Sequence, residues 1–64
     1  MDYKLILHFK MFRKSIGITQ IELAQRSGLN KNIVSRFETG GNIKIESLMK
    51  MLKVLGLKLV IIED

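Results

Sequence analysis

The sequence lacks cysteine altogether and contains one histidine, His8, so neither a disulfide nor a cysteine and histidine metal site is available to hold the chain together. No apolar run approaches the ~18 residues that a membrane-spanning helix needs, and the first residues carry no cleavage-site pattern of a secretory signal. The sequence contains no linker, internal repeat or low-complexity tract. We therefore expect one domain over residues 1–64, in the cytoplasm, with no membrane, metal or other cofactor.

The same scarcity argues against an enzyme. With no cysteine, one histidine and no second polar cluster, the chain offers no set of groups on which to assemble catalysis. At 64 residues it is also near the lower size at which a chain builds its own core. Stability must therefore come from well-packed helices, from association with another copy, or from both.

What the sequence does contain is an excess of positive charge. Eleven lysines and arginines stand against six acidic residues, which gives a formal net charge of +5 and a pI near 9.9. A compact basic domain is typical of proteins that bind nucleic acid or an anionic membrane surface. Charge alone does not choose between these two partners.

The spacing of apolar residues predicts two helices in the first half of the chain. In the first, over residues 3–16, four apolar residues recur at spacings of four, three and four and define an inward face: Leu5, Phe9, Phe12 and Ile16. Gly17 then ends this helix. The second helix starts at Thr19, which forms a Thr-x-x-Glu capping box with Glu22, and it ends at Gly28.

Two further helices are predicted in the second half. The third starts after Asn30, a good N-cap residue, and turns Val34 and Phe37 inward. Residues 39–42 carry two glycines and are predicted to form a loop. The fourth helix covers about residues 44–55 before Gly56 stops it, and its apolar face consists of Ile45, Leu48, Leu52 and Leu55.

The segment over residues 57–62 has the composition of a β-strand, because it is short, rich in β-branched residues and bounded by a glycine and an acidic end. A single strand leaves its backbone donors and acceptors unpaired. The only internal candidate, residues 3–7, continues without a break into the first helix. We therefore predict pairing with the same strand of a second copy.

Apolar residues outside the predicted core support such a dimer. They fall off the inward face of the fourth helix or lie in the terminal segment, where both faces of a strand would carry apolar groups. The predicted dimer interface consists of Met49, Val54, Leu57, Leu59, Val60, Ile61 and Ile62. The alternative is a slightly apolar monomer surface.

The stretch ITQIELAQRSGLNKNIVSRFETG, residues 18–40, resembles the Cro/repressor-type helix-turn-helix family, often called XRE-like. The shared pattern is Thr-Gln-x-x-Leu-Ala, a turn glycine, and Ile/Val-Ser-x-aromatic-Glu-x-Gly, within a likeness over about residues 5–57. The terminal segment after VLGLK resembles the dimer-locking C-terminal strand of HipB-type antitoxins. The resemblance implies a mainly α, lambda-repressor-like domain of four or more helices, with one C-terminal β-strand pairing across a dimer.

The resemblance also implies where DNA would lie, because in the family the third helix enters the major groove and the start of the second touches the sugar-phosphate backbone. With Val34 and Phe37 inward, the side chains that face the bases are Lys31, Asn32, Ser35 and Arg36. Arginine or lysine can reach guanine, and asparagine can pair with adenine. The implied phosphate contacts are Thr19, Gln20, Gly40, Gly41, Asn42 and Lys44.

Two lysines strengthen this interpretation because each breaks a local rule. Lys31 in the first turn opposes the helix dipole, and Lys44 stands where serine or threonine would cap better. A facing polyanion would offset both costs. The simpler alternatives are that the polar stripe is a solvated face, that Gln20 is an exposed helix former, and that residues 39–42 are an ordinary loop.

Arg13 and Glu38 match family positions that pair in a partly buried salt bridge, which implies a structural role. The function implied is a homodimeric, sequence-specific repressor at the nucleoid, bound to an inverted-repeat operator in double-stranded DNA.

The expected setting is an autoregulating antitoxin with a kinase-like toxin partner. A stand-alone phage or plasmid Cro-type repressor is the close alternative. Other classes are a protein-interaction module or a basic membrane-surface protein, although the latter would not need a capping box, a turn glycine and a recognition stripe in register.

Overall fold

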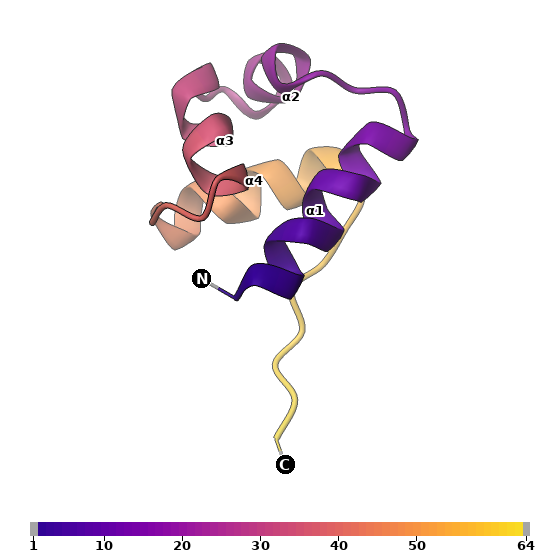
Figure 1. The fold of residues 1–64 in the computed structure, drawn as a ribbon, viewed down its shortest axis with the longest axis vertical. Helices are drawn as coiled ribbons and strands as arrows, with labels where there is room; N and C mark the ends of the chain where they lie inside the picture. Colours follow the sequence, from indigo (N-terminus) through magenta and orange to yellow (C-terminus); the bar gives the residue numbers. More distant parts are fainter. Residues whose placement is uncertain (1, 64) are drawn as a thin grey trace.

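A computed structural model describes residues 2–63 of the chain. Within this range the chain forms four helices: α1 (Tyr3–Ser15), α2 (Gln20–Ser27), α3 (Lys31–Glu38) and α4 (Ile45–Leu55). As Figure 1 shows, α2 and α3 lie at one end of the helical body, α4 runs beneath them, and the C-terminal segment leaves on the opposite side. Helix α2 packs against both α3 and α4, and α1 packs against α3.

Local side-chain chemistry sets the helix starts. The predicted capping box is confirmed: Thr19 Oγ1 accepts a hydrogen bond from the Glu22 amide (3.1 Å), and the Glu22 carboxylate accepts one from the Thr19 amide (3.3 Å). Asn30 caps α3 as predicted, since its Oδ1 accepts from the Asn32 amide at 2.7 Å. Lys44 precedes α4 without any side-chain capping bond, so that helix start is left without a local polar partner.

Glycines set the helix ends. At the end of α2, Gly28 adopts a left-handed conformation (φ 69°), which lets the Leu29 amide reach back to the Ala24 carbonyl at 2.8 Å. Leu29 then packs against the core. Helices α1 and α4 end in the same way, at Gly17 and Gly56.

The core lies where the four helices meet. Its largest fully buried side chains are Leu23, Val34, Phe37 and Met51. Phe9 of α1 meets Phe37 of α3 edge to face, with ring centroids 4.8 Å apart and planes at 80°. This aromatic pair fixes α1 against the buried side of α3.

The predicted inward face of α1 is wrong in part. Phe9 is buried, but Phe12 and Ile16 are 36% and 46% exposed, and the buried residues beside Phe9 are Ile6 and Arg13. Because Glu38 holds Arg13 in the interior, the buried face of the helix is rotated away from the stripe that hydropathy alone selects.

The predicted face of α4 needs a similar correction. Ile45 is 61% exposed, whereas Met51, which the predicted face did not include, is fully buried. Leu48, Leu52 and Leu55 are buried as predicted. Ile45 is the first residue of the helix and lies at its periphery, so the apolar period continues past the edge of the core.

None of the described residues forms a β-strand, so the strand predicted over residues 57–62 is absent from the single chain. Leu57 still belongs to the helical body, since its amide donates to the Leu52 carbonyl (2.9 Å) and its side chain packs against the core. The following segment extends away from the helices (Figure 1), and Ile61 is 90% exposed. A strand here would require backbone partners that the single chain does not supply.

Candidate nucleic-acid interface

Helices α2 and α3 form a helix-turn-helix unit. Each helix has eight residues, and the turn between them consists of Gly28, Leu29 and Asn30. Each turn residue contributes differently, because Gly28 ends α2, Leu29 anchors the turn in the core, and Asn30 starts α3. The two helices are therefore held in one fixed relation.

Helix α3 presents a polar face to solvent. Its buried side is formed by Val34, Phe37 and Glu38. The four predicted base-contacting residues lie on the other side, where Lys31, Asn32 and Arg36 are exposed and Ser35 is half-buried. No salt bridge within the described residues engages Lys31 or Arg36, so their charges are available to a ligand.

The predicted phosphate-contacting residues fall into two groups. Asn42 and Lys44 are exposed near the start of α4. Thr19 and Gln20, at the start of α2, already make hydrogen bonds within the protein: Thr19 Oγ1 caps the helix, and Gln20 Nε2 donates to Glu38 Oε1 at 2.9 Å. For Gln20 this leaves one amide hydrogen and the backbone N–H for any contact with DNA.

The loop after α3 differs from the prediction that its glycine amides face a phosphate. The Gly40 amide donates to the Phe37 carbonyl (3.1 Å), and the Gly41 amide donates to the Arg36 carbonyl (2.8 Å). This pair of bonds is the Schellman arrangement that satisfies the last carbonyls of a helix. Both amides are therefore used inside the loop, and the predicted phosphate contacts of Gly40 and Gly41 have no free donor in this conformation.

A buried polar network joins three of the helices. Arg13 Nε and Nη2 donate to the two carboxylate oxygens of Glu38 at 2.6 and 3.0 Å, and the side chains are only 6% and 1% exposed. Arg13 Nη1 also donates to the Ile18 carbonyl at 2.6 Å. With the bond from Gln20, Glu38 ties α1 and the start of α2 to the end of α3. The pairing of Gln20 with Glu38 was not predicted, because no local pattern links residues 18 positions apart.

The network keeps Glu38 ionised. Burial raises the pKa of Glu38, but hydrogen bonds from Arg13 and Gln20, with the positive charges of Arg13 and Lys10, outweigh burial and lower that pKa below its ordinary value. The charged form is therefore the one that holds α3 in position.

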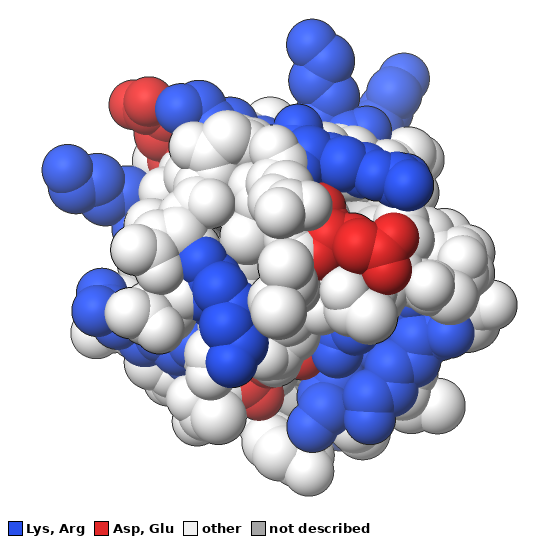
Figure 2. All heavy atoms as spheres, turned by 90° about the horizontal axis from the view of Figure 1, so that it is seen from above, with Lys and Arg blue, Asp and Glu red and all other residues white. Residues whose placement is uncertain are grey.

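The end of the molecule that carries α2 and α3 is basic at its margins. Figure 2 looks onto this end from above: lysine and arginine side chains lie around its rim and also on the face, where they cover more of the surface than the acidic side chains do. Over residues 2–63, no cluster of three or more His, Cys, Asp or Glu side chains could hold a metal ion. No described helix is both long and apolar enough to cross a bilayer.

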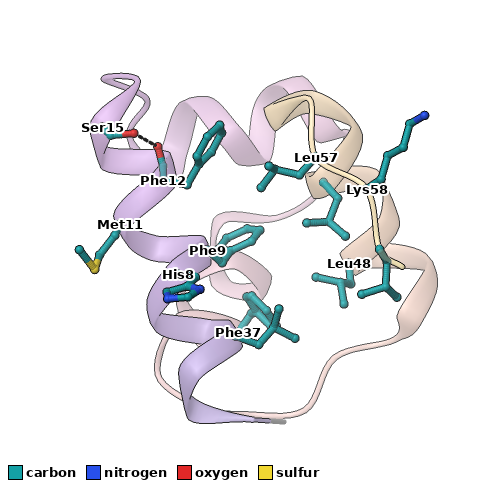
Figure 3. Close-up of a pocket in the computed structure, with 12 residues that line it drawn as sticks. His8, Phe9, Met11, Phe12, Ser15, Phe37, Leu48, Leu57 and Lys58 are labelled. Atoms are coloured by element: carbon teal, nitrogen blue, oxygen red, sulfur yellow. Dashed lines mark hydrogen bonds between the residues drawn. The ribbon is translucent and has the colours of Figure 1, made fainter. Parts of the chain in front are cut away.

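An apolar hollow lies on the opposite side, between α1 and the segment after α4. Its volume is about 480 Å³, and its walls include Leu5, Phe12, Leu52 and Leu59. Figure 3 shows Phe9, Phe12 and Leu57 directed into this space. The hollow is open to solvent on its outer side because Phe12 and Leu59 remain partly exposed.

The residues of the predicted dimer interface differ in how far they are buried in the single chain. Val54 and Leu57 pack against this chain's own core. The others are exposed: Met49, Leu59, Val60, Ile61 and Ile62. Met49 and Leu59 line a second apolar hollow, between α4 and the terminal segment.

Comparisons with known proteins agree with this geometry. The family model described as HTH_3, helix-turn-helix, matches residues 9–62. A solved structure titled "MDT Protein" is similar to the chain, with 30% sequence identity and a TM-score of 0.86 over 94% of this chain and 86% of that one. No curated protein matches the sequence.

Proposed function

The chain belongs to the Cro- and XRE-like helix-turn-helix family of DNA-binding transcription regulators, and we propose that it acts as a homodimeric, sequence-specific repressor of an inverted-repeat operator. The observation that carries the proposal is the exposed face of α3. There Lys31, Asn32, Ser35 and Arg36 are held by a buried network and a fixed turn on the opposite side. Side chains of these types bond guanine and adenine edges in the major groove.

Contacts with the DNA backbone follow from the ends of the neighbouring helices. Lys44, exposed at the start of α4, and Asn42 before it provide donors beside α3. Thr19 and Gln20 provide donors at the start of α2, where the helix dipole favours a phosphate. We propose these four as phosphate contacts, which position the protein on DNA without reading its sequence.

The homodimer is supported by the apolar surface on the opposite side. Val60, Ile61 and Ile62 are 71%, 90% and 82% exposed, and they extend beyond two apolar hollows of the same chain. Antiparallel pairing of this segment with its copy would supply the missing backbone partners and cover Met49 and Leu59. A two-fold dimer would place its α3 helices about one helical turn, ~10 bp, apart.

The biological setting we propose is an autoregulating antitoxin of the HipB type, with a kinase-like toxin as its protein partner. The likeness of the terminal segment to the strand of such antitoxins supports this setting. A stand-alone Cro-type repressor would use the same chemistry on DNA. A kinase-like protein encoded in the adjacent reading frame, and captured by this chain on co-expression, would favour the antitoxin.

Selection from a random duplex library tests the DNA-binding proposal. We expect enrichment of an inverted repeat, tighter binding to it than to a scrambled duplex, and a sedimentation mass of two chains. Liposomes of anionic lipid serve as the competing ligand. Binding to liposomes without preference among duplexes would contradict the proposal and favour a membrane-surface protein.

A further inference from the structure

We propose that Gly41 is a positioning residue for Arg36, whose side-chain stem occupies the space that a Cβ at position 41 would fill. This inference rests on the proposed function, in which Arg36 reads a base. It assigns to Gly41 a role in specificity, in place of a direct phosphate contact.

The distances between the two residues carry the inference. A Cβ placed on Gly41 would lie 2.5 Å from Arg36 Cγ, far inside van der Waals contact, and 3.4 Å from Arg36 Cδ, at the edge of ordinary contact. It would also lie 3.0 Å from the Arg36 carbonyl oxygen. The aliphatic stem of Arg36 therefore runs over the bare backbone of Gly41, which is itself only half-buried.

The backbone of Arg36 cannot easily move to relieve such a contact. Its carbonyl accepts hydrogen bonds from the Gly41 amide (2.8 Å) and from Thr39 Oγ1 (3.1 Å). An alanine methyl at position 41 must then be accommodated by the Arg36 side chain. Because Cγ is the second carbon of that side chain, its displacement means a new χ1 rotamer, which redirects the guanidinium.

Backbone conformation does not account for glycine at this position. Gly40 takes the left-handed conformation that ends the helix (φ +93°), whereas Gly41 does not lie in the left-handed region. At the other three helix ends the residue after the left-handed glycine is aliphatic: Ile18, Leu29 and Leu57. Helix α3 alone among the described helices has a second glycine there, so what Gly41 supplies is space.

The test is a double-variant cycle with G41A and R36A, using equilibrium binding to the selected operator and to its scrambled duplex. We expect G41A to reduce the preference for the operator roughly ten-fold, as the loss of one base contact would. In the R36A background, G41A should change that preference by less than about two-fold, because the side chain it displaces is gone. The matched control is G40A, which strains the backbone but meets no atom within 4 Å; it should lower the unfolding midpoint and keep the preference.

The outcomes separate the inference from the proposed function. If R36A binds both duplexes like the parent, the base contact of Arg36 is wrong and the inference falls with it. If R36A loses the preference while G41A keeps it, or if G41A acts equally in both backgrounds, only the role of Gly41 is wrong. Should G41A fail to fold, R36A/G41A should regain most of the lost stability, because only the closer contact, with the Arg36 side chain, is removed. A double variant no more stable than G41A overturns the inference.

Discussion

Arg13 of α1 and Glu38 at the end of α3 lie 25 positions apart in the sequence and form a two-point ion pair in the interior. Beside it, Phe9 and Phe37 join the same two helices through their rings. One polar and one apolar contact thus define how α3 sits on α1. Both contacts help to hold the opposite, exposed face of α3 in position.

We expect Arg13→Ala to destabilise the domain by ~3 kcal/mol, because it leaves the buried carboxylate of Glu38 without its main partner. Thermal unfolding followed by circular dichroism measures the loss. The control is Arg26→Ala, which removes an exposed partner 3.9 Å from Glu22 and should cost no more than ~0.5 kcal/mol. Equal losses in the two variants would mean that the buried pair adds nothing beyond a surface pair.

Acid should weaken the buried ion pair between Arg13 and Glu38. The folded-state pKa of Glu38 lies below its ordinary value of 4.5, so the unfolded chain binds the proton more readily. Its contribution to stability is complete above about pH 4.5 and is lost as the pH falls through the lower, folded-state pKa. We expect Glu38→Gln to be less stable at neutral pH and to lose less on acidification. A variant whose unfolding midpoint falls as steeply as the parent's would assign the acid sensitivity to another group.

Arg36→Ala and Lys44→Ala should weaken DNA binding in different ways. Loss of a base contact should cost ~1–3 kcal/mol on the operator and relax the preference at one base pair per half-site. Loss of a phosphate contact should weaken binding to every duplex alike and reduce the salt slope by about one unit. The control is Lys53→Ala, which removes the same charge at the other end of α4. Titrations at several salt concentrations distinguish these effects; identical behaviour of all three variants would point to non-specific charge attraction.

Removal of residues 59–64 should separate the dimer without unfolding the helices. The cut lies after Lys58 because Leu57 packs against the core and must remain. We expect a monomer by sedimentation, with helical content retained and weak DNA binding that no longer depends on half-site spacing. A truncated chain that still sediments as a dimer would place the interface on the helices alone.

Ser27→Ala should be neutral or stabilising by up to ~1 kcal/mol. The Ser27 hydroxyl is buried at the end of α2 and has no hydrogen-bond partner within the described residues. Removing an unpaired polar group also removes the cost of burying it. A lower unfolding midpoint would reveal a hydrogen bond, for example to an internal water, that the hydroxyl makes in solution.

The helix boundaries were predictable from sequence because the chemistry that sets them is local. Thr19 with Glu22, the Asn30 cap and Gly28 each act within a few residues, so a short stretch of sequence contains the whole interaction. The polar face of α3 was also predictable from a short stretch of sequence, because the inward position of Val34 determines which side chains of the helix point outward.

The buried face of α1 was not predictable in the same way. Hydropathy counts Arg13 as a surface residue, and the family resemblance, not the local pattern, predicted the salt bridge with Glu38 that holds it in the interior. The partners of Gln20 and Gly41 also depend on how α3 packs and ends. The strand predicted over residues 57–62 is a different case, since the single chain does not form it and the proposed hydrogen-bond partners belong to a second copy.

Helices α2 and α3 have only eight residues each, so the proposed DNA-contacting face depends on the packed domain. Helices this short are marginal on their own in water, where ~12–15 residues are needed even in favourable sequences. The exposed face of α3 therefore exists only in the packed domain. A ligand that binds the folded state alone stabilises that state by mass action. Operator DNA would therefore protect the chain from proteases that attack its unfolded state.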